Sequence, residues 1–209
     1  MAIRHRESDK AYAGLREMII RLQLEPGSVI DERVIMRKLG TGRTPLREAI
    51  NRLAAEKLVV IVPHRGTFVA DIRDGDAWQL FEARLHIERL AARLAAERIT
   101  AEQLQRLESL FSALPENDDF VGDPDTDWKF HQGIAEATHN RHLVDVVERL
   151  YSHSVRLKYL RPSANPFCEP LREYREVLAA LRDRDPARAE EAMAQHMAHL
   201  KEKINVPGA

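Results

Sequence analysis

The order of hydrophobic and polar positions divides the chain into a mixed first third and a helical remainder. Apolar residues recur every three or four positions over residues 10–22, again after Asp31, and again from Thr44, which predicts three short helices. Two runs rich in β-branched residues follow, at 58–62 and 67–70. Three helices followed by a hairpin are the element order of a winged helix-turn-helix.

Residues that favour helix ends support this division. Asp31 can cap the second helix with its carboxylate, and Gly40 suits the left-handed position that ends it. The third helix is expected to open at Thr44 and Pro45, with the Thr44 hydroxyl as its cap and Pro45 at the first helical position, where its missing N–H costs nothing.

From Asp74 onward the pattern is helical with polar breaks, and no strand pattern returns. The breaks are short, so neighbouring helices are expected to pack antiparallel as a bundle. We therefore predict a mainly α protein with a winged helix-turn-helix domain and a small β-hairpin over residues 1–72, and an all-α antiparallel helical bundle over 73–209. The helices of the bundle are predicted at residues 75–98, 101–114, 125–138, 140–160, 167–183 and 186–204.

Composition is that of a globular protein with no membrane segment. Of the 209 residues, 44% are hydrophobic and 31% charged, and no stretch approaches the roughly 18 apolar residues of a membrane helix. The first ten residues are charged and lack the apolar core of a secretory signal, so a cytoplasmic location is expected. The single cysteine, Cys168, excludes an internal disulfide and is interpreted as a loop residue without a role.

Charge is unevenly distributed and changes the functional picture. Residues 1–72 hold 13 Lys and Arg against 9 Asp and Glu, a net charge of +4, whereas the remainder holds 19 against 24, a net charge of −5. This asymmetry predicts a polyanionic partner for the first domain only.

The predicted third helix carries the side chains expected of a DNA reader. With its apolar stripe packed inward, its opposite face presents Arg43, Thr44, Arg47 and Asn51. These are hydrogen-bond donors around a helix N-terminus, whose free N–H groups and dipole favour phosphate.

Two pairs of motifs carry a family resemblance. The segments Asp31-Glu32-Arg33 and Arg43-Thr44-Pro45-Leu46-Arg47-Glu48-Ala49 resemble the signature of GntR-family regulators. Arg84-Leu85-His86-Ile87-Glu88 and Asp127-Trp128-Lys129-Phe130-His131 resemble the FCD sensor domain of the FadR subfamily. The resemblance covers nearly the whole chain and implies a homodimeric regulator that binds a palindromic double-stranded DNA operator and responds to a small molecule.

The resemblance also implies DNA contacts. Arg33, Arg43 and Arg47 would be the main contacting side chains, with Thr44 on phosphate, and arginine suits the O6 and N7 acceptors of guanine. Gly42 departs from the family, which usually has Ser or Thr there. The complete expected set, with the wing tip, is Arg33, Arg43, Thr44, Arg47, Asn51, His64, Arg65 and Gly66.

Polar residues inside the predicted bundle indicate a ligand or metal site. Asp127 and His131 lie one turn apart and His196 lies in the last helix, a set that would suit zinc, nickel, manganese or iron. In the FCD domains that this chain resembles, another histidine commonly completes such a site, but Tyr174 stands at that position. Three interpretations remain open: a three-ligand metal site, a hydrogen-bonded ligand pocket without metal, and purely structural roles.

Arg84 is the principal candidate for binding an effector. Arg84 and Glu88 form either a surface ion pair or the inward polar part of the first bundle helix. In similar proteins the matching arginine faces the pocket, where a guanidinium grips a carboxylate at two points, so an organic acid or sugar acid is the expected effector. Tyr174 is expected to help, and His153 and Arg156 are weaker candidates.

The function predicted is therefore that of a DNA-binding transcriptional regulator, not an enzyme, whose operator affinity is controlled by an effector in the helical domain. A helical metalloenzyme using the two histidines and the aspartate is the alternative, because such sets also occur in non-haem iron oxygenases. An interaction module without DNA binding is a third interpretation, and it leaves the basic third helix unexplained.

Overall fold

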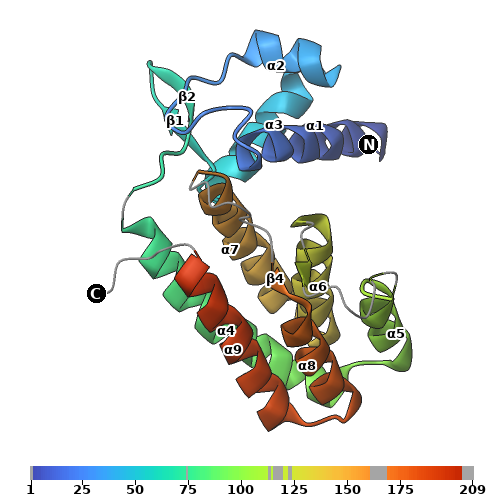
Figure 1. The fold of residues 1–209 in the computed structure, drawn as a ribbon. Coiled ribbons are helices and arrows are strands. Elements are labelled where there is room, and N and C mark those ends of the chain that lie inside the picture. The colour runs from blue at the N-terminus through green and yellow to red at the C-terminus, as the bar shows by residue number, and fades with distance from the viewer. Residues whose placement is uncertain are drawn as a thin grey trace. The chain divides into compact units, whose positions relative to one another are not determined.

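The chain divides into two compact units, residues 1–74 and 75–209. The structure is a computed structural model (Figure 1). It describes residues 2–73, 75–112, 114, 120–121, 124–160 and 169–203. Cys168 lies outside the described residues.

The first unit has three helices and an antiparallel hairpin (Figure 1). In the hairpin Val59 pairs with Val69, and Phe68 also bridges to Val29 at the start of the domain. The expected element order is confirmed. The elements are α1 (Ala2–Ile20), α2 (Glu32–Leu39), α3 (Arg43–Ala55), β1 (Val59–Val62) and β2 (Gly66–Val69).

Packing in the first unit fixes which face of α3 points outward. Helix α1 packs along α3, and the apolar stripe of α3 belongs to the core of this unit. Leu46 and Leu53 are fully buried and belong to the same core cluster as Leu15 and Ile19 of α1. A helix whose apolar stripe is buried on one side presents its polar positions on the other.

The predicted ends of α2 are confirmed, but α3 starts two residues earlier than expected. Asp31 accepts hydrogen bonds from the N–H groups of Arg33 and Val34, and Gly40 ends α2 with a φ of 61°. Helix α3 begins at Arg43 with Gly42 as its N-cap. Thr44 therefore lies inside the first turn instead of capping it.

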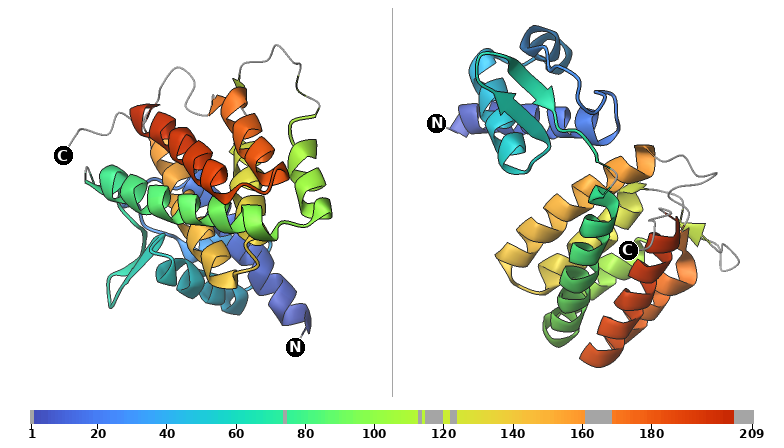
Figure 2. Two further views of the ribbon diagram at one scale, coloured as in Figure 1. Left: turned by 90° about the horizontal axis from the view of Figure 1, so that it is seen from below. Right: turned by 90° about the vertical axis from the view of Figure 1, so that its left-hand side faces the viewer.

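The second unit is a bundle of helices (Figure 2). Helix α4 packs against α9, α7 and α6, and α8 packs against α9. Helices α4 and α9 lie side by side in each view of the bundle (Figure 2). The helices are α4 (Asp76–Arg98), α5 (Ala101–Ser109), α6 (Pro124–Ala137), α7 (Arg141–Leu160), α8 (Leu171–Arg182) and α9 (Pro186–Lys203).

The mainly α fold class is confirmed, with one addition. A short antiparallel pair joins β3 (Phe120–Val121) to β4 (Glu169–Pro170), so the expectation that no strand follows the hairpin was wrong in this detail. Strands of two residues contain no alternation that a sequence pattern could reveal.

No helix within the described ranges combines the length and the apolar character needed to cross a membrane.

Candidate functional site

All eight residues predicted to contact DNA are exposed in the first unit. They come from α2, from α3, from the turn between β1 and β2, and from the first residue of β2. The side chains of Arg43 and Arg47 are 72% and 59% exposed. The exposed set is Arg33, Arg43, Thr44, Arg47, Asn51, His64, Arg65 and Gly66.

The arginines of α3 are loosely held. Glu32 of α2 lies with its Oε2 3.4 Å from Nε of Arg47 and 3.8 Å from Nε of Arg43. Exposed ion pairs of this kind contribute about 0 to 1 kcal/mol, so both guanidinium groups can exchange Glu32 for another acceptor at little cost. The N-cap Gly42 has no side chain to accept from the first turn of α3, which leaves backbone N–H groups there for an anion.

A tight turn presents the wing tip. The N–H of Arg65 donates to the carbonyl of Val62 at 3.1 Å, and His64 and Gly66 both have positive φ, at 60° and 120°. The turn thereby holds the His64 and Arg65 side chains at the end of the hairpin, outside the core.

A second group of polar residues is buried in the helical unit around Asp127 of α6. The Oδ1 atom of Asp127 accepts from the hydroxyl of Tyr174 at 2.7 Å, and Oδ2 accepts from the hydroxyl of Tyr151 at 2.7 Å. Nζ of Lys158 lies 3.5 Å from Oδ2, and Nε2 of His131 lies 3.3 Å from Oδ1. These five residues, with Arg84, Glu88, Ser154, His196 and Glu173, are called the polar cluster below.

Arg84, Glu88 and His131 extend the polar cluster into α4. Nε of Arg84 donates to Oε1 of Glu88 at 2.6 Å, and its Nη1 donates to Oγ of Ser154 at 2.7 Å. The other carboxylate oxygen of Glu88 contacts Nδ1 of His131. All three side chains are at most 3% exposed. The sequence allowed either a surface ion pair or an inward polar pair for Arg84 and Glu88, and the structure has the inward pair.

Burial and charge act in opposite directions on these groups. Burial by itself would lower the pKa of His131, but Glu88 and Asp127 beside it raise that pKa to about 9. Burial would raise the pKa of Glu88, whereas Arg84 and His131 lower it to about 2. The pKa of Asp127 is also held well below its usual value, against burial, by Lys158, His131 and His196. At neutral pH the polar cluster is thus a set of paired charges.

The two histidines face each other. Nδ1 of His196 lies 3.1 Å from Oε2 of Glu173, and Nε2 of His196 lies 3.4 Å from Nε2 of His131. Because a carboxylate occupies Nδ1 of each ring, both Nε2 atoms point into the same space beside Asp127. A protonated His131 can donate from Nε2 to either neighbour.

The distances in this space would admit a metal ion. Ligand atoms of Asp127, His131 and His196 lie within 4.8 Å of one another. Two of the separations, 3.3 and 3.4 Å, match ligands that share one ion, since bonds of about 2.1 Å place such ligands roughly 3 to 3.5 Å apart. The donor set fits less well, because the hydroxyl of Tyr174 donates to the ligating carboxylate and the ammonium of Lys158 lies beside it.

Of the four residues expected to bind an effector, the structure brings two into the polar cluster. Arg84 and Tyr174 are both buried there. His153 and Arg156 lie on α7, whose helical period directs them to the side opposite the polar-cluster residues of that helix. Arg156 is nevertheless buried in the helical unit, and the expected role of His153 and Arg156 in effector binding stays a prediction.

Sequence reasoning missed three residues of α7 that do face Asp127 and Arg84. Tyr151, Ser154 and Lys158 stand at positions i, i+3 and i+7, so they share one face of α7. A polar stripe with this spacing in a helix that must be buried was a usable signal. Glu173 was also missed, and it carried no such signal because its partners His196 and His199 lie on another helix.

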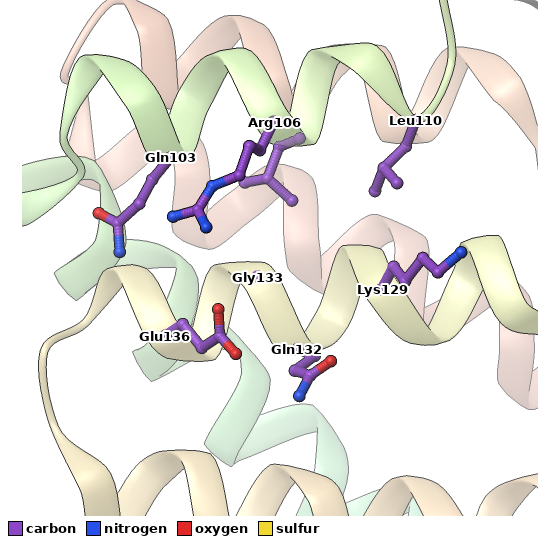
Figure 3. A pocket seen from close by; sticks show the side chains of 8 residues that line it. Gln103, Arg106, Leu110, Lys129, Gln132, Gly133 and Glu136 are labelled. Atoms are coloured by element: carbon purple, nitrogen blue, oxygen red, sulfur yellow. The ribbon is translucent and has the colours of Figure 1, made fainter.

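A shallow groove lies apart from the polar cluster, between α5 and α6 (Figure 3). Arg106 and Leu110 line it from one side, and Lys129, Gln132 and Glu136 from the other (Figure 3). The helices approach closely at Gly133, where a Cβ atom would lie 2.6 Å from Leu107. Its lining is mixed in charge and contains none of the predicted site residues.

A winged helix with an exposed basic reading face, joined to a helical unit with a buried polar cluster, defines a class of protein: a helix-turn-helix regulator with a sensor domain. Residues 7–69 match the gntR family of bacterial regulatory proteins, and residues 79–199 match the FCD domain. The chain belongs to the GntR family and carries an FCD domain.

Known relatives agree with this assignment along nearly the whole chain. The HTH-type transcriptional repressor RspR of Escherichia coli (strain K12) is 29% identical over 94% of this chain and 88% of its own length. The HTH-type transcriptional repressor GlaR of the same organism is 27% identical over 89% of this chain and 90% of its own. Among solved structures, E. coli McbR/YncC superposes with a TM-score of 0.78 at 21% identity, covering 95% of this chain and 97% of that one.

These matches confirm the predicted family, fold class and regulatory function. The chain is a DNA-binding transcriptional regulator with an effector-binding helical domain. Its relatives are regulators, which does not favour the metalloenzyme alternative.

Proposed function

We propose that two copies of this chain bind a palindromic operator, and that a small carboxylate-bearing molecule in the helical unit changes their affinity for it. The observation that carries the DNA-binding part is the exposure of all eight predicted contact residues on one small folded unit. Binding to chromosomal DNA assigns this activity to the cytoplasm.

Each part of the exposed face has a distinct role in this proposal. Arg43 and Arg47 leave Glu32 and donate to base edges in the major groove, where guanine offers two acceptors to one guanidinium. Thr44 and the N–H groups of the first turn of α3 bind phosphate, which fixes the register of the helix. His64 and Arg65 reach the neighbouring backbone or minor groove from the wing.

The effector part of the proposal rests on Arg84 and Tyr174. Nη2 of Arg84 is buried and has no hydrogen-bond partner among the described residues, so one edge of the guanidinium can still receive a carboxylate. Tyr174 offers a hydroxyl that now donates to Asp127. Because the polar cluster is buried, an incoming acid must displace existing contacts and shift the helices. The effector would then bind the shifted arrangement of helices more tightly than the original one. Such a difference in affinity is the condition for a ligand to switch a protein between two states.

The test is an operator titration with and without candidate acids. An operator would first be selected from random duplex DNA by the full chain, and its affinity measured by fluorescence anisotropy over a panel of organic and sugar acids. We expect at least one acid to change the affinity, and Tyr174→Phe to shift the acid concentration required without changing operator affinity in its absence. A panel without effect, on a protein that binds its operator, would contradict the effector part alone.

A further inference from the structure

The polar cluster contains a buried lysine in addition to the three residues that could bind a metal, Asp127, His131 and His196. Lys158 is 5% exposed, and its Nζ lies 3.5 Å from Oδ2 of Asp127. A buried ammonium requires a compensating negative charge. The Lys158 ammonium finds this charge on Asp127, the same carboxylate that a metal ion would need as a ligand.

Four hydrogen-bond donors already surround the carboxylate of Asp127. It offers about four lone-pair positions. Hydroxyls of Tyr174 and Tyr151 take one on each oxygen, at 2.7 Å in both cases. The ammonium of Lys158 approaches Oδ2, and Nε2 of His131 approaches Oδ1. A metal ion could bind Asp127 only by displacing one of these four donors.

Charge balance points the same way. Three positive charges, on Arg84, Lys158 and the protonated His131, lie among three carboxylates, those of Glu88, Asp127 and Glu173. A divalent ion would add two positive charges to this balanced group, or one if it displaced the proton of His131. Uncompensated charge in a protein interior costs several kcal/mol per ion, so the ion would be disfavoured here despite suitable distances.

We infer that Lys158 and the Tyr174 hydroxyl hold Asp127 in place of a metal, so that this effector domain works without one. The Lys158 ammonium supplies the positive charge at Asp127. The Tyr174 hydroxyl takes the position at Asp127 that a further metal ligand would occupy beside His131 and His196. This inference goes beyond the proposed regulatory function and does not depend on which effector binds.

The experiment uses the full chain, purified without a histidine tag, and measures metal content by mass spectrometry. Thermal unfolding is then followed with chelator and with Zn²⁺, Ni²⁺, Mn²⁺ or Fe²⁺ added singly. We expect the unaltered chain to contain far less than one ion per chain and to unfold at the same temperature in every condition. One ion per chain, or a melting temperature that falls with chelator, would overturn the inference.

Variants test whether Lys158 and Tyr174 are the cause. Lys158→Met keeps the stem and removes the charge, so affinity for Zn²⁺ should rise at least tenfold by equilibrium dialysis. Adding Tyr174→His supplies another ligand, and saturating Zn²⁺ should then raise the melting temperature by roughly 5 to 10 °C. The matched control is Lys129→Met on α6, outside the polar cluster, which should behave as the unaltered chain. Folded variants that gain no affinity would overturn the inference.

A second readout separates this inference from the proposed function. Operator binding by the unaltered chain should be the same in chelator and in added metal. Loss of operator binding in both conditions would count against the DNA-binding proposal, whereas binding that requires added metal would overturn the metal-free interpretation.

Discussion

The two units of the chain use arginine in opposite ways. In the first unit Arg43 and Arg47 are 72% and 59% exposed and share one carboxylate, that of Glu32, at 3.8 and 3.4 Å. In the second, Arg84 is 2% exposed and bonded to Glu88 at 2.6 Å. An exposed pair contributes little to stability, while a buried one is expensive to break. The outward arginines are thus available to DNA, and the inward one is part of the fold of the sensor.

Breaking the inward pair should give the largest effect. Arg84→Met leaves Glu88 buried without its main partner, so the free energy of unfolding of the helical unit should fall by about 3 to 5 kcal/mol. Urea titration followed by tryptophan fluorescence measures this selectively, since Trp78 and Trp128 both belong to the second unit.

The control for this variant is Arg93→Met, an exposed arginine of the same helix α4. Its free energy of unfolding should change by no more than about 0.5 kcal/mol. A loss below about 1 kcal/mol in Arg84→Met would mean that the buried pair is not structural and would remove the contrast between the units.

Alkaline pH should weaken the second unit through His131. Its pKa is raised from 6.5 to about 9, so its contribution to stability is complete below pH 6.5 and is lost as the pH rises through about 9. Between pH 6.5 and 9.5 the free energy of unfolding should fall by about 2 to 3 kcal/mol in the same fluorescence assay. Glu88→Gln should shrink the pH-dependent part of this loss, and equal stability at both pH values would rule out a protonated His131.

The outward arginines should show the reverse profile. Arg47→Ala should weaken binding to the selected operator by about 1 to 3 kcal/mol, because a base contact is lost. The free energy of unfolding should stay within about 0.5 kcal/mol, because an exposed side chain is removed. Anisotropy titration against operator and scrambled duplexes checks the first value, with Arg21→Ala of the α1 end as control. Equal loss on both duplexes would make Arg47 a phosphate contact instead of a base contact.

The smallest expected effect concerns the N-terminus of α3. Gly42 has a φ of −82°, and a Cβ atom there would lie 3.7 Å from Cδ of Pro45, so Gly42→Ser fits without strain. The serine hydroxyl should cap the first turn and stabilise the protein by a few tenths of a kcal/mol. Gly40→Ser is the matched control, since its φ of 61° makes a side chain unfavourable. Thermal unfolding should separate the two variants in opposite directions.

Local signals in the sequence predicted the first unit well. The cap at Asp31, the left-handed Gly40 and the exposed face of α3 all depend on neighbours within a few residues, and each is confirmed. The start of α3 was misplaced by two residues because Thr44 and Pro45 are favoured both at the cap and first position and further inside the first turn.

The polar cluster was only half predictable, for a physical reason. Asp127 and His131 lie one turn apart on a single helix, so their proximity follows from the sequence. The contacts of Asp127 with Tyr151, Lys158 and Tyr174 join residues 24 to 47 positions apart in the chain and depend on how α6, α7 and α8 pack. The helical period sets a face for each residue, but which faces meet is a property of the bundle.

The central claim, that the outward guanidinium groups read DNA, is tested most directly by one binding measurement. The full chain would select duplexes from a random pool, and the affinity of the enriched sequence would be compared with that of a scrambled duplex at one salt concentration. We predict a palindromic sequence bound at least about a thousandfold more tightly than the scrambled control. A pool without enrichment, or equal affinity for both duplexes, would contradict the account.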